Sequence, residues 1–135
     1  MSSDTPTAGD PLHTIAHAQA CLVKGTATLR ELAKMMQDNA CSALLVTKHD
    51  GSHAVVTERD IVRALARDLE PDDDWAVDVM SLDIRKLPPD APIIDAAALM
   101  QEAVIRHVVM DHGDDDLRLV SIRDLLAHFI ATVED

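Results

Sequence analysis

The chain has 135 residues, of which 47% are hydrophobic, so it is long enough to form one ordinary domain with a packed core. Its 24 acidic and 12 basic residues give a formal net charge of -12, which opposes binding to nucleic acid or to an anionic membrane. No apolar run reaches the roughly 18 to 20 residues that span a bilayer. Residues 1–11 lack the basic and apolar regions of a signal peptide. We therefore expect a cytoplasmic protein with no nucleic acid and no membrane as a partner.

Hydrophobic periodicity and turn signals predict the elements of the first half of the chain. In chain order we expect a flexible tail at 1–11, a short helix at 12–20, a strand at 21–24, an amphipathic helix at 29–40, strands at 43–47 and 54–56, and a helix from Thr57 to Pro71. The Asp50-Gly51 pair between the two later strands predicts a hairpin turn.

The second half repeats this order after an acidic linker at 71–75 that contains three aspartates. We expect a strand at 84–87, a helix at 92–103 with proline in its first turn, strands at 107–111 and 117–120, and a last helix at 121–133. The aspartate runs at 72–74 and 114–116 are typical of solvated turns.

The second half also repeats the first in sequence. Residues 29–62 align on residues 93–126 without a gap. The identical pairs are Ala33 and Ala97, Met36 and Met100, Gln37 and Gln101, Asp50 and Asp114, Val56 and Val120, Arg59 and Arg123, and Asp60 and Asp124. The offset between the copies is 64 residues. Such a repeat marks a duplicated supersecondary unit that packs against its copy to bury its hydrophobic face. The expected fold class is therefore α/β (α+β) with two β-α-β-β-α repeats, and function is expected between the copies.

Each repeat places a hydroxyl and a carboxylate where a strand gives way to a helix. Thr57 and Asp60 hold these positions in the first repeat, and Ser121 and Asp124 in the second. Ser or Thr followed three positions later by an acidic residue is typical of a helix capping box, which needs no ligand. The N-terminus of a helix also favours phosphate, and a carboxylate beside it could accept both hydroxyls of a ribose. The spacing favours capping but leaves both interpretations open.

Four segments make the chain resemble the tandem CBS (cystathionine-β-synthase) domain pair. They are residues 55–61 (Val-Val-Thr-Glu-Arg-Asp-Ile), their weaker copy at 119–125, residues 105–109 (Ile-Arg-His-Val-Val) and residues 77–80 (Val-Asp-Val-Met). The resemblance covers residues 12–131. It implies a stand-alone, bacterial-type regulatory protein in which two repeats, related by a pseudo-twofold axis, form two clefts. In many members of this family such clefts bind adenosine-containing ligands.

The resemblance also implies the residues that would bind the ligand. The Asp of each signature would hold the ribose, the Ser or Thr would lie near the phosphate, and each cleft would draw on both repeats. One cleft would combine Thr57, Arg59 and Asp60 with Arg85, Ile105 and Arg106, and the other would combine Ser121 and Asp124 with Cys21, Cys41 and Ser42. We favour the first cleft, because its arginines offset the anionic charge of the chain. The expected ligand is AMP, ADP, ATP or S-adenosylmethionine, with no covalent cofactor.

These boundaries divide the chain into a tail at 1–11, a first repeat at 12–70, the linker at 71–75 and a second repeat at 76–135. The first repeat departs from the family pattern before its first strand, where Thr14-Ile15-Ala16 stands in place of the Asp78-Val79-Met80 of the second. The wall of the second cleft is therefore the less typical one.

A metal site and an enzyme are the alternatives to a ligand sensor. His13 and His17 are four residues apart, and His49 and His53 flank the hairpin turn, yet neither pair has a third ligand at a diagnostic spacing. Gly-x-Ser-x-Gly, Cys-His and phosphate-cradling glycine motifs are all missing from the sequence, so we expect no catalysis. The main alternative is a ligand-free CBS-pair module that only dimerises.

The remaining expectations concern thiols and association. Cys21 and Cys41 lack metal-type or redox-type spacing, so reduced and mostly buried thiols are expected. Apolar residues on the later helices of the repeats predict a disc-like homodimer. The residues expected on that surface are Ile61, Leu65, Leu125 and Phe129. The sequence does not identify the regulated protein.

Overall fold

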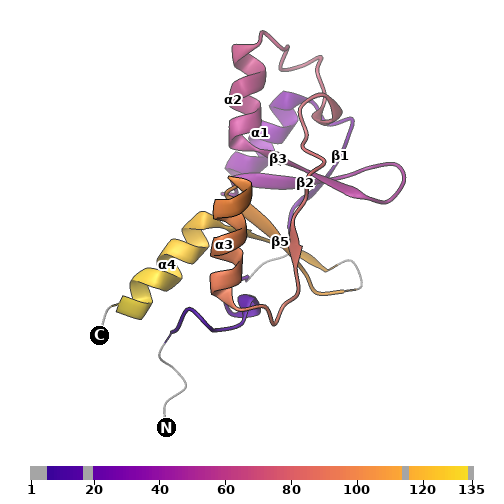
Figure 1. Cartoon of the computed structure of the whole chain (residues 1–135). Coiled ribbons are helices and arrows are strands. Elements are labelled where there is room, and N and C mark those ends of the chain that lie inside the picture. The colour runs from indigo at the N-terminus through magenta and orange to yellow at the C-terminus, as the bar shows by residue number, and fades with distance from the viewer. Residues whose placement is uncertain (1–5, 17–19, 114–115, 134–135) are drawn as a thin grey trace. The chain divides into compact units, whose positions relative to one another are not determined.

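The computed structural model describes residues 6–16, 20–113 and 116–133. Its elements are, in chain order, η1 (Leu12–Thr14), β1 (Leu22–Lys24), α1 (Leu29–Asp38), β2 (Ala43–Thr47), β3 (His53–Thr57), α2 (Glu58–Ala66), η2 (Ala76–Asp78), β4 (Lys86–Leu87), α3 (Ile93–Ala103), β5 (His107–Asp111), β6 (Leu117–Ser121) and α4 (Ile122–Val133) (Figure 1). The described residues group into two compact units. One is formed by residues 20–84, and the other by residues 6–16 together with 85–133.

The unit of residues 20–84 contains one three-stranded sheet with the order β1-β2-β3. β1 runs parallel to β2 because α1 connects them, and β2 runs antiparallel to β3 because a tight turn connects them. Gly51 takes a positive φ of 88° in this turn, a conformation that favours glycine. The backbone N–H of Ser52 donates to Asp50 Oδ1 at 2.9 Å, which fixes the turn next to it.

The second unit repeats this topology with the order β4-β5-β6. Its parallel and antiparallel pairs have the same register as those of the first unit once the constant offset of the sequence alignment is applied. Leu22 pairs with Leu45 in one unit, and Lys86 pairs with Val109 in the other. The predicted fold class, with two β-α-β-β-α repeats, is thereby confirmed.

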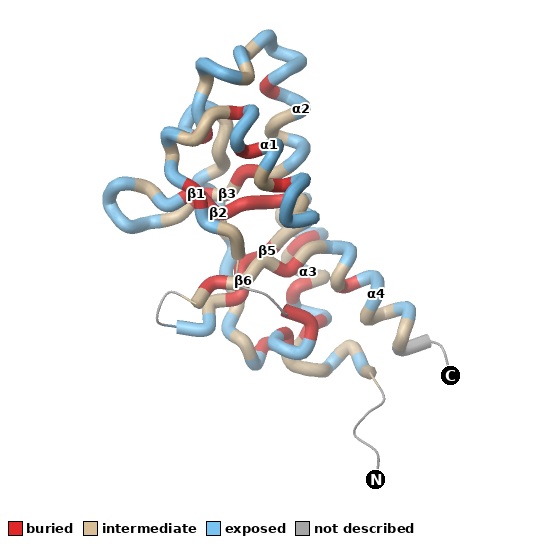
Figure 2. Tube along the Cα trace, turned by 180° about the vertical axis from the view of Figure 1, so that it is seen from behind, coloured by how far each residue is buried: buried red, intermediate tan, exposed pale blue. Residues whose placement is uncertain are grey.

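One helix in each unit buries a single apolar stripe against its own sheet (Figure 2). The stripe of α1 is Leu29, Leu32 and Met36, and that of α3 is Ile93, Ala96 and Met100. These helical spacings place all three side chains on one face. The strands supply the facing residues, which are Leu44, Val46, Ala54 and Val56 in one unit and Val108, Met110 and Val120 in the other.

The segment before each repeat packs on the unit that contains the other repeat. We call residues 10–16 the first lead-in and residues 74–80 the second lead-in. In the first lead-in the N–H of Leu12 donates to the carbonyl of Ala91 at 2.8 Å. In the second, the N–H of Ala76 donates to the carbonyl of Ala27, also at 2.8 Å. These two hydrogen bonds are related by the sequence offset, so the exchange of lead-ins is reciprocal.

A further bridge between backbones confirms this reciprocity. Pro11 pairs with Pro92, and Trp75 pairs with Thr28 at the equivalent position. Gly25 makes close approach of the second lead-in possible, since a Cβ at this residue would meet Cγ1 of Val77 at 2.6 Å.

The compact units therefore differ from the boundaries expected from the sequence. Leu12, Ile15 and Ala16 are at most 9% exposed and join the core of residues 85–133, not that of the first repeat. The helix expected at 12–20 is only the 3-10 turn η1, and residues 17–19 lie outside the described part of the chain. Because Leu12 is buried in this core, the described residues before it belong to the unit that contains the second repeat.

The predicted exposed surface of the later helices needs correction. Leu125 is 2% exposed, and Ile61 and Phe129 are partly buried against the cores, so only Leu65 of that set is exposed. The apolar residues that are exposed on α4 lie on a second stripe at i, i+4 and i+8. This stripe, the α4 outer stripe, consists of Ile122, Leu126 and Ile130.

Candidate functional site

The first signature lies at the junction of β3 and α2. Thr57 ends the strand and caps the helix, and Asp60 is the third residue of that helix. The N–H of Thr57 donates to Asp60 Oδ2 at 2.8 Å, and the N–H of Asp60 donates to Thr57 Oγ1 at 3.3 Å. These reciprocal hydrogen bonds form a capping box.

The second signature has the same geometry at the junction of β6 and α4. The N–H of Ser121 donates to Asp124 Oδ2 at 2.8 Å, and the N–H of Asp124 donates to Ser121 Oγ at 3.2 Å. All four signature side chains, Thr57, Asp60, Ser121 and Asp124, are half-buried. Both predicted hydroxyl and carboxylate pairs therefore exist, and capping accounts for one oxygen of each carboxylate.

The other carboxylate oxygen is the one open to a ligand. Within the described residues, neither Asp60 Oδ1 nor Asp124 Oδ1 takes part in a hydrogen bond. A carboxylate with one fixed and one open oxygen is held in position by the fold and can still accept hydrogen bonds from hydroxyl groups. The positive end of the helix dipole stabilises its charge.

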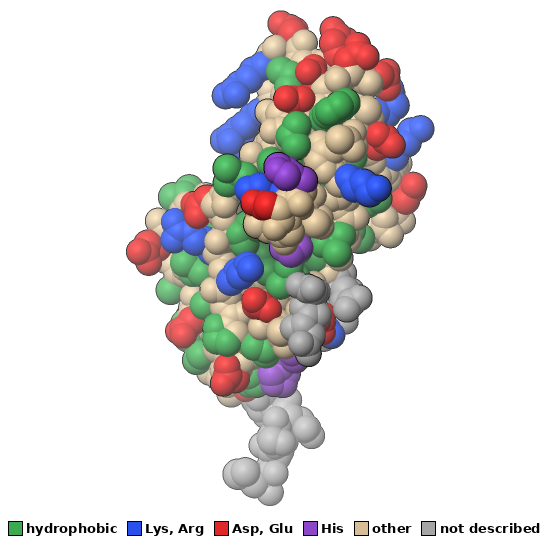
Figure 3. Space-filling view, turned by 90° about the vertical axis from the view of Figure 1, so that its right-hand side faces the viewer, with side chains coloured by type: hydrophobic (Ala, Val, Ile, Leu, Met, Phe, Trp, Pro, Cys, Tyr) green, Lys and Arg blue, Asp and Glu red, His purple; other side chains and the backbone are tan. Residues whose placement is uncertain are grey.

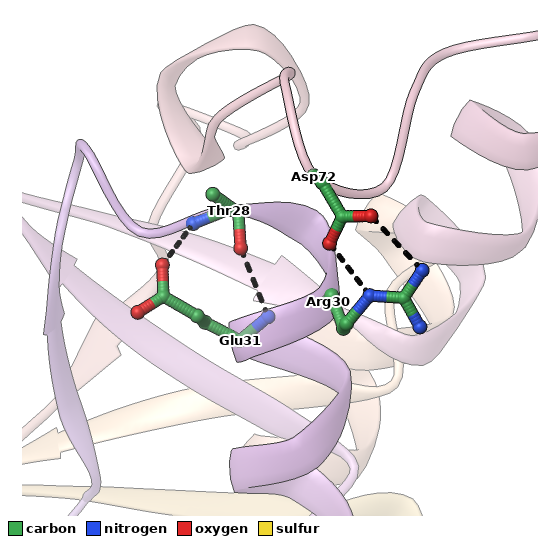
Figure 4. Close-up of polar contacts among 4 residues, drawn as sticks. All are labelled: Thr28, Arg30, Glu31 and Asp72. Carbon is green, nitrogen blue, oxygen red and sulfur yellow. Dashed lines mark hydrogen bonds and ion pairs between the residues drawn. The ribbon is translucent and has the colours of Figure 1, made fainter.

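A third capping box shows that this geometry does not by itself identify a ligand site. At the start of α1, the N–H of Glu31 donates to Thr28 Oγ1 at 3.2 Å and the N–H of Thr28 donates to Glu31 Oε1 at 2.9 Å (Figure 4). These hydrogen bonds lower the pKa of Glu31, that with the backbone of Thr28 most strongly. The Thr-x-x-Glu spacing is visible in the sequence, but neither residue is among those predicted to bind a ligand.

Within each unit, further predicted residues lie around its own signature. The carbonyl of Ser42 accepts from the N–H of Glu58 at 3.0 Å, and the carbonyl of Arg106 accepts from the N–H of Ile122 at 2.8 Å. Both donors are the first residue of the helix that follows the signature. Ser42 therefore lies beside the first signature, and Arg106 beside the second.

The other predicted residues are equivalent between the units as well. The carbonyl of Cys21 accepts from the N–H of Leu45 at 3.0 Å, as that of Arg85 does from Val109 at 2.9 Å. Cys41 and Ile105 each follow the first helix of their repeat, and each donates its N–H to a methionine carbonyl of that helix. The structure thus gathers Cys21, Cys41 and Ser42 in one unit and Arg85, Ile105 and Arg106 in the other. Their expected assignment to the signature of the opposite repeat stays a prediction.

Positive charge is available at both signatures. Arg59 and Arg123 belong to the signatures and Arg106 lies beside the second one, and all three residues are exposed, as is Arg85 elsewhere in the same unit as Arg106. On the face shown in Figure 3, basic and acidic side chains are interspersed, so its described part offers no broad basic surface of the kind that binds nucleic acid.

The histidines do not form a metal site in the described part of the chain. No group of three His, Cys, Asp or Glu side chains there could hold an ion, and His17 lies outside the described residues. His128 is instead a structural residue whose Nε2 donates to the carbonyl of Thr7 at 2.6 Å. The same Nε2 lies 3.6 Å from Asp10 Oδ2.

The acidic linker packs on the start of α1. Nε and Nη2 of Arg30 donate to the two carboxylate oxygens of Asp72 at 2.6 and 3.1 Å (Figure 4). The N–H of Arg30 donates to the carbonyl of Pro71. This exposed ion pair lowers the pKa of Asp72 through the hydrogen bond from Arg30. The aspartate run therefore serves a turn, as the sequence predicted for a solvated segment.

None of the helices in the described ranges combines the length and the apolar character that crossing a membrane requires. The duplicated topology and the paired signatures define a tandem α/β domain pair. The chain belongs to the CBS domain family, whose domain matches residues 19–67 and 76–131. It therefore carries two CBS domains in tandem, as the resemblance implied.

The chain is similar to individual proteins over most of its length. An uncharacterized protein of Methanopyrus kandleri is 28% identical over 116 residues, which are 82% of this chain and 59% of that protein. A CBS domain protein from Pyrobaculum aerophilum, solved in complex with AMP, is 28% identical with a TM-score of 0.77, covering 93% of this chain and 99% of that one. A CBS domain pair solved with 5′-methylthioadenosine and S-adenosyl-L-methionine shares the fold at 19% identity and a TM-score of 0.78, covering 88% and 98%.

Proposed function

We propose that this chain is a non-catalytic regulatory module that binds an adenosine-containing ligand and reports its occupancy to a regulated protein. The observation that supports this most strongly is the pair of signature carboxylates, each held through Oδ2 while Oδ1 stays open. The AMP complex of the Pyrobaculum aerophilum relative indicates the class of ligand. AMP, ADP, ATP and S-adenosylmethionine are the candidates.

In this proposal the ligand uses the signatures in a defined way. Asp60 or Asp124 accepts the ribose hydroxyls through Oδ1, and Thr57 or Ser121 lies near the phosphate at the helix N-terminus. Arginines supply the charge that a phosphate requires. Arg59 serves the first signature from its own repeat, and Arg85, Ile105 and Arg106 are proposed to complete that cleft. Cys21, Cys41 and Ser42 are proposed to complete the other.

Isothermal titration calorimetry with AMP, ADP, ATP, NAD and S-adenosylmethionine tests the proposal. Asp60→Asn and Asp124→Asn are the informative variants, because asparagine still accepts the capping hydrogen bond but has lost the charge. We expect the variant of the occupied site to bind at least about tenfold more weakly, since a hydrogen bond to a charged group contributes about 1.5 to 3 kcal/mol. We expect the larger loss for Asp60→Asn.

Glu31→Gln provides the matched control, because it changes the acidic partner of a capping box outside the signatures. It should leave the affinity unchanged. Absence of heat with every ligand at millimolar concentration would contradict ligand binding altogether. Binding that survives unchanged in both Asp variants would keep the sensor and reject the site.

A ligand-free dimerisation module is the second candidate, favoured by the exposed α4 outer stripe. Leu126 is 53% and Ile130 56% exposed, and contiguous exposed apolar residues mark interaction surfaces. A homodimer is proposed under either function. The calorimetric titration separates them, because only the regulatory module requires a ligand.

A further inference from the structure

Two cysteines that are distant in sequence lie at the same end of neighbouring strands. Cys21 directly precedes β1, Cys41 lies between α1 and β2, and the two strands run parallel. The hydrogen bond from the N–H of Leu45 to the carbonyl of Cys21 fixes the first at the side of β2. The hydrogen bond from the N–H of Cys41 to the carbonyl of Met36 fixes the second. Both thiols are free, half-buried and packed against the same core.

The two thiols interact with each other. Burial raises the pKa of Cys41, and the neighbouring Cys21 raises it further. The two residues stand at the same end of neighbouring parallel strands and pack against one core, so the fold holds both thiols on one side of the sheet. The chain has only these two cysteines, and the described residues bring no third metal ligand to them. The geometry thus suits a dithiol better than a metal site.

The pair is a feature of this chain and not of the repeat. The residues at the equivalent positions of the second unit are Arg85 and Ile105, which hold the same backbone hydrogen bonds without a thiol. The shared fold therefore does not require cysteine at either position. The presence of two thiols there can instead reflect a chemical role.

We propose that Cys21 and Cys41 form a reversible intramolecular disulfide when the protein meets a peroxide or a small disulfide. With hydrogen peroxide, two S–H bonds and the O–O bond break and one S–S bond forms. The two electrons reduce the peroxide, and the two protons leave in two molecules of water. With oxidised glutathione, the same electrons produce two molecules of reduced glutathione.

The environment of Cys41 limits how readily this thiol starts the reaction. The thiolate is the nucleophile in thiol–disulfide exchange, and a raised pKa leaves little Cys41 thiolate at neutral pH. Attack by Cys41 should therefore be slow near neutral pH and faster at higher pH, while the equilibrium of the pair depends on the proximity that the fold imposes.

Equilibration of the full chain with reduced and oxidised glutathione, in buffer and in urea, tests the proposal. After acid quenching and alkylation, mass spectrometry should find a species that carries no alkyl group and is lighter by about 2 Da than the unalkylated dithiol, with Cys21 linked to Cys41. We expect the ratio of disulfide to dithiol to be at least about tenfold higher in the native chain than in urea, because the fold keeps the thiols together.

Cys21→Ser and Cys41→Ser provide the controls, since each leaves one thiol that can form only a glutathione adduct or a link between two molecules. Equal ratios in buffer and in urea would overturn the proposal. So would native protein in which oxidised glutathione yields only adducts or intermolecular disulfides. The ratio measured for the wild-type chain does not depend on how well the variants fold.

Discussion

In Asp60 and Asp124, one carboxylate is proposed to serve both capping and ligand binding. Oδ2 closes the capping box, and Oδ1 remains open within the described structure. The sequence predicted both capping and a ligand site from the same spacing, because both need a carboxylate at a helix N-terminus. It could not predict that the cap engages only one of the two carboxylate oxygens, since that depends on the backbone angles of the strand end.

The caps themselves should contribute to stability. We expect Thr57→Ala to lower the free energy of unfolding by about 1 kcal/mol, because the N–H of Asp60 loses its acceptor. Urea denaturation measures this loss. Thr28→Ala should cost a similar amount at α1, but only Thr57→Ala should also weaken ligand binding. Equal effects of both variants on ligand affinity would contradict a special role for the signature.

A pH titration tests the anchoring of the N-terminal residues. The N–H of Thr7 donates to Asp10 Oδ2 and its hydroxyl to Oδ1, both at 2.9 Å. The pKa of Asp10 is lowered below its usual 3.8. The hydrogen bond from the backbone of Thr7 is the largest cause, followed by the hydrogen bond from the Thr7 hydroxyl and the charge of His128. A lowered pKa means that this anchoring is complete above pH 3.8 and is lost as the pH falls through the folded-state pKa.

The amide resonance of Thr7 should therefore shift in NMR spectra with a midpoint below pH 3.8. Asp10→Asn should abolish that transition. A midpoint at or above the usual value would show that the hydrogen bonds from Thr7 are not maintained in solution.

The helix α4 is apolar on two sides, and this is why its exposed surface was wrongly predicted. Leu125 and Phe129 are four residues apart and face the core, and Leu126 and Ile130 repeat the same spacing one position later. Periodicity alone gives two equivalent stripes and cannot tell which one the sheet will cover. The α1 helix posed no such problem, since charged residues separate the members of its single stripe.

Substitution on the α4 outer stripe tests association. We expect Leu126→Glu and Ile130→Glu to convert a homodimer into a monomer, because each places a charge in an apolar contact. Light scattering with size-exclusion chromatography measures the mass. Ile94→Glu is the control, as Ile94 is 48% exposed on α3 and lies outside the stripe. A wild-type chain that is monomeric at high concentration would contradict the dimer.

Strands, helices and hairpin turns could be predicted because their signals are local. Alternation, Asp50-Gly51 and the proline before α3 each act within a few residues. The destination of the first lead-in could not be predicted in this way, since Leu12 reaches its partners across most of the chain. The sequence feature that indicates this packing is the alignment of the two repeats. When the same offset is continued towards the N-terminus, Leu12 aligns on Ala76, and both residues are fully buried.

The stability of each compact unit depends on the lead-in that packs on it. Leu12→Ala should lower the free energy of unfolding of the unit with residues 85–133 by about 3 kcal/mol, because Leu12 is fully buried in that core. Hydrogen exchange should show lost protection in α3 and α4, with α1 retaining most of its own. Equal losses in both units would argue that they unfold as one, and an effect confined to residues 20–84 would contradict the observed packing.

Because the lead-ins are exchanged, the repeats of the sequence and the compact units of the structure have different boundaries. Along the chain each repeat follows its own lead-in, whereas residues 20–84 form a compact unit that contains the lead-in of the other repeat. In connectivity the molecule is thus one domain inserted into another, between residue 16 and Arg85. A gene fragment cut at the repeat boundary would leave each core without its lead-in, and a peptide of residues 6–16 should rebind to a chain that starts at Ala20.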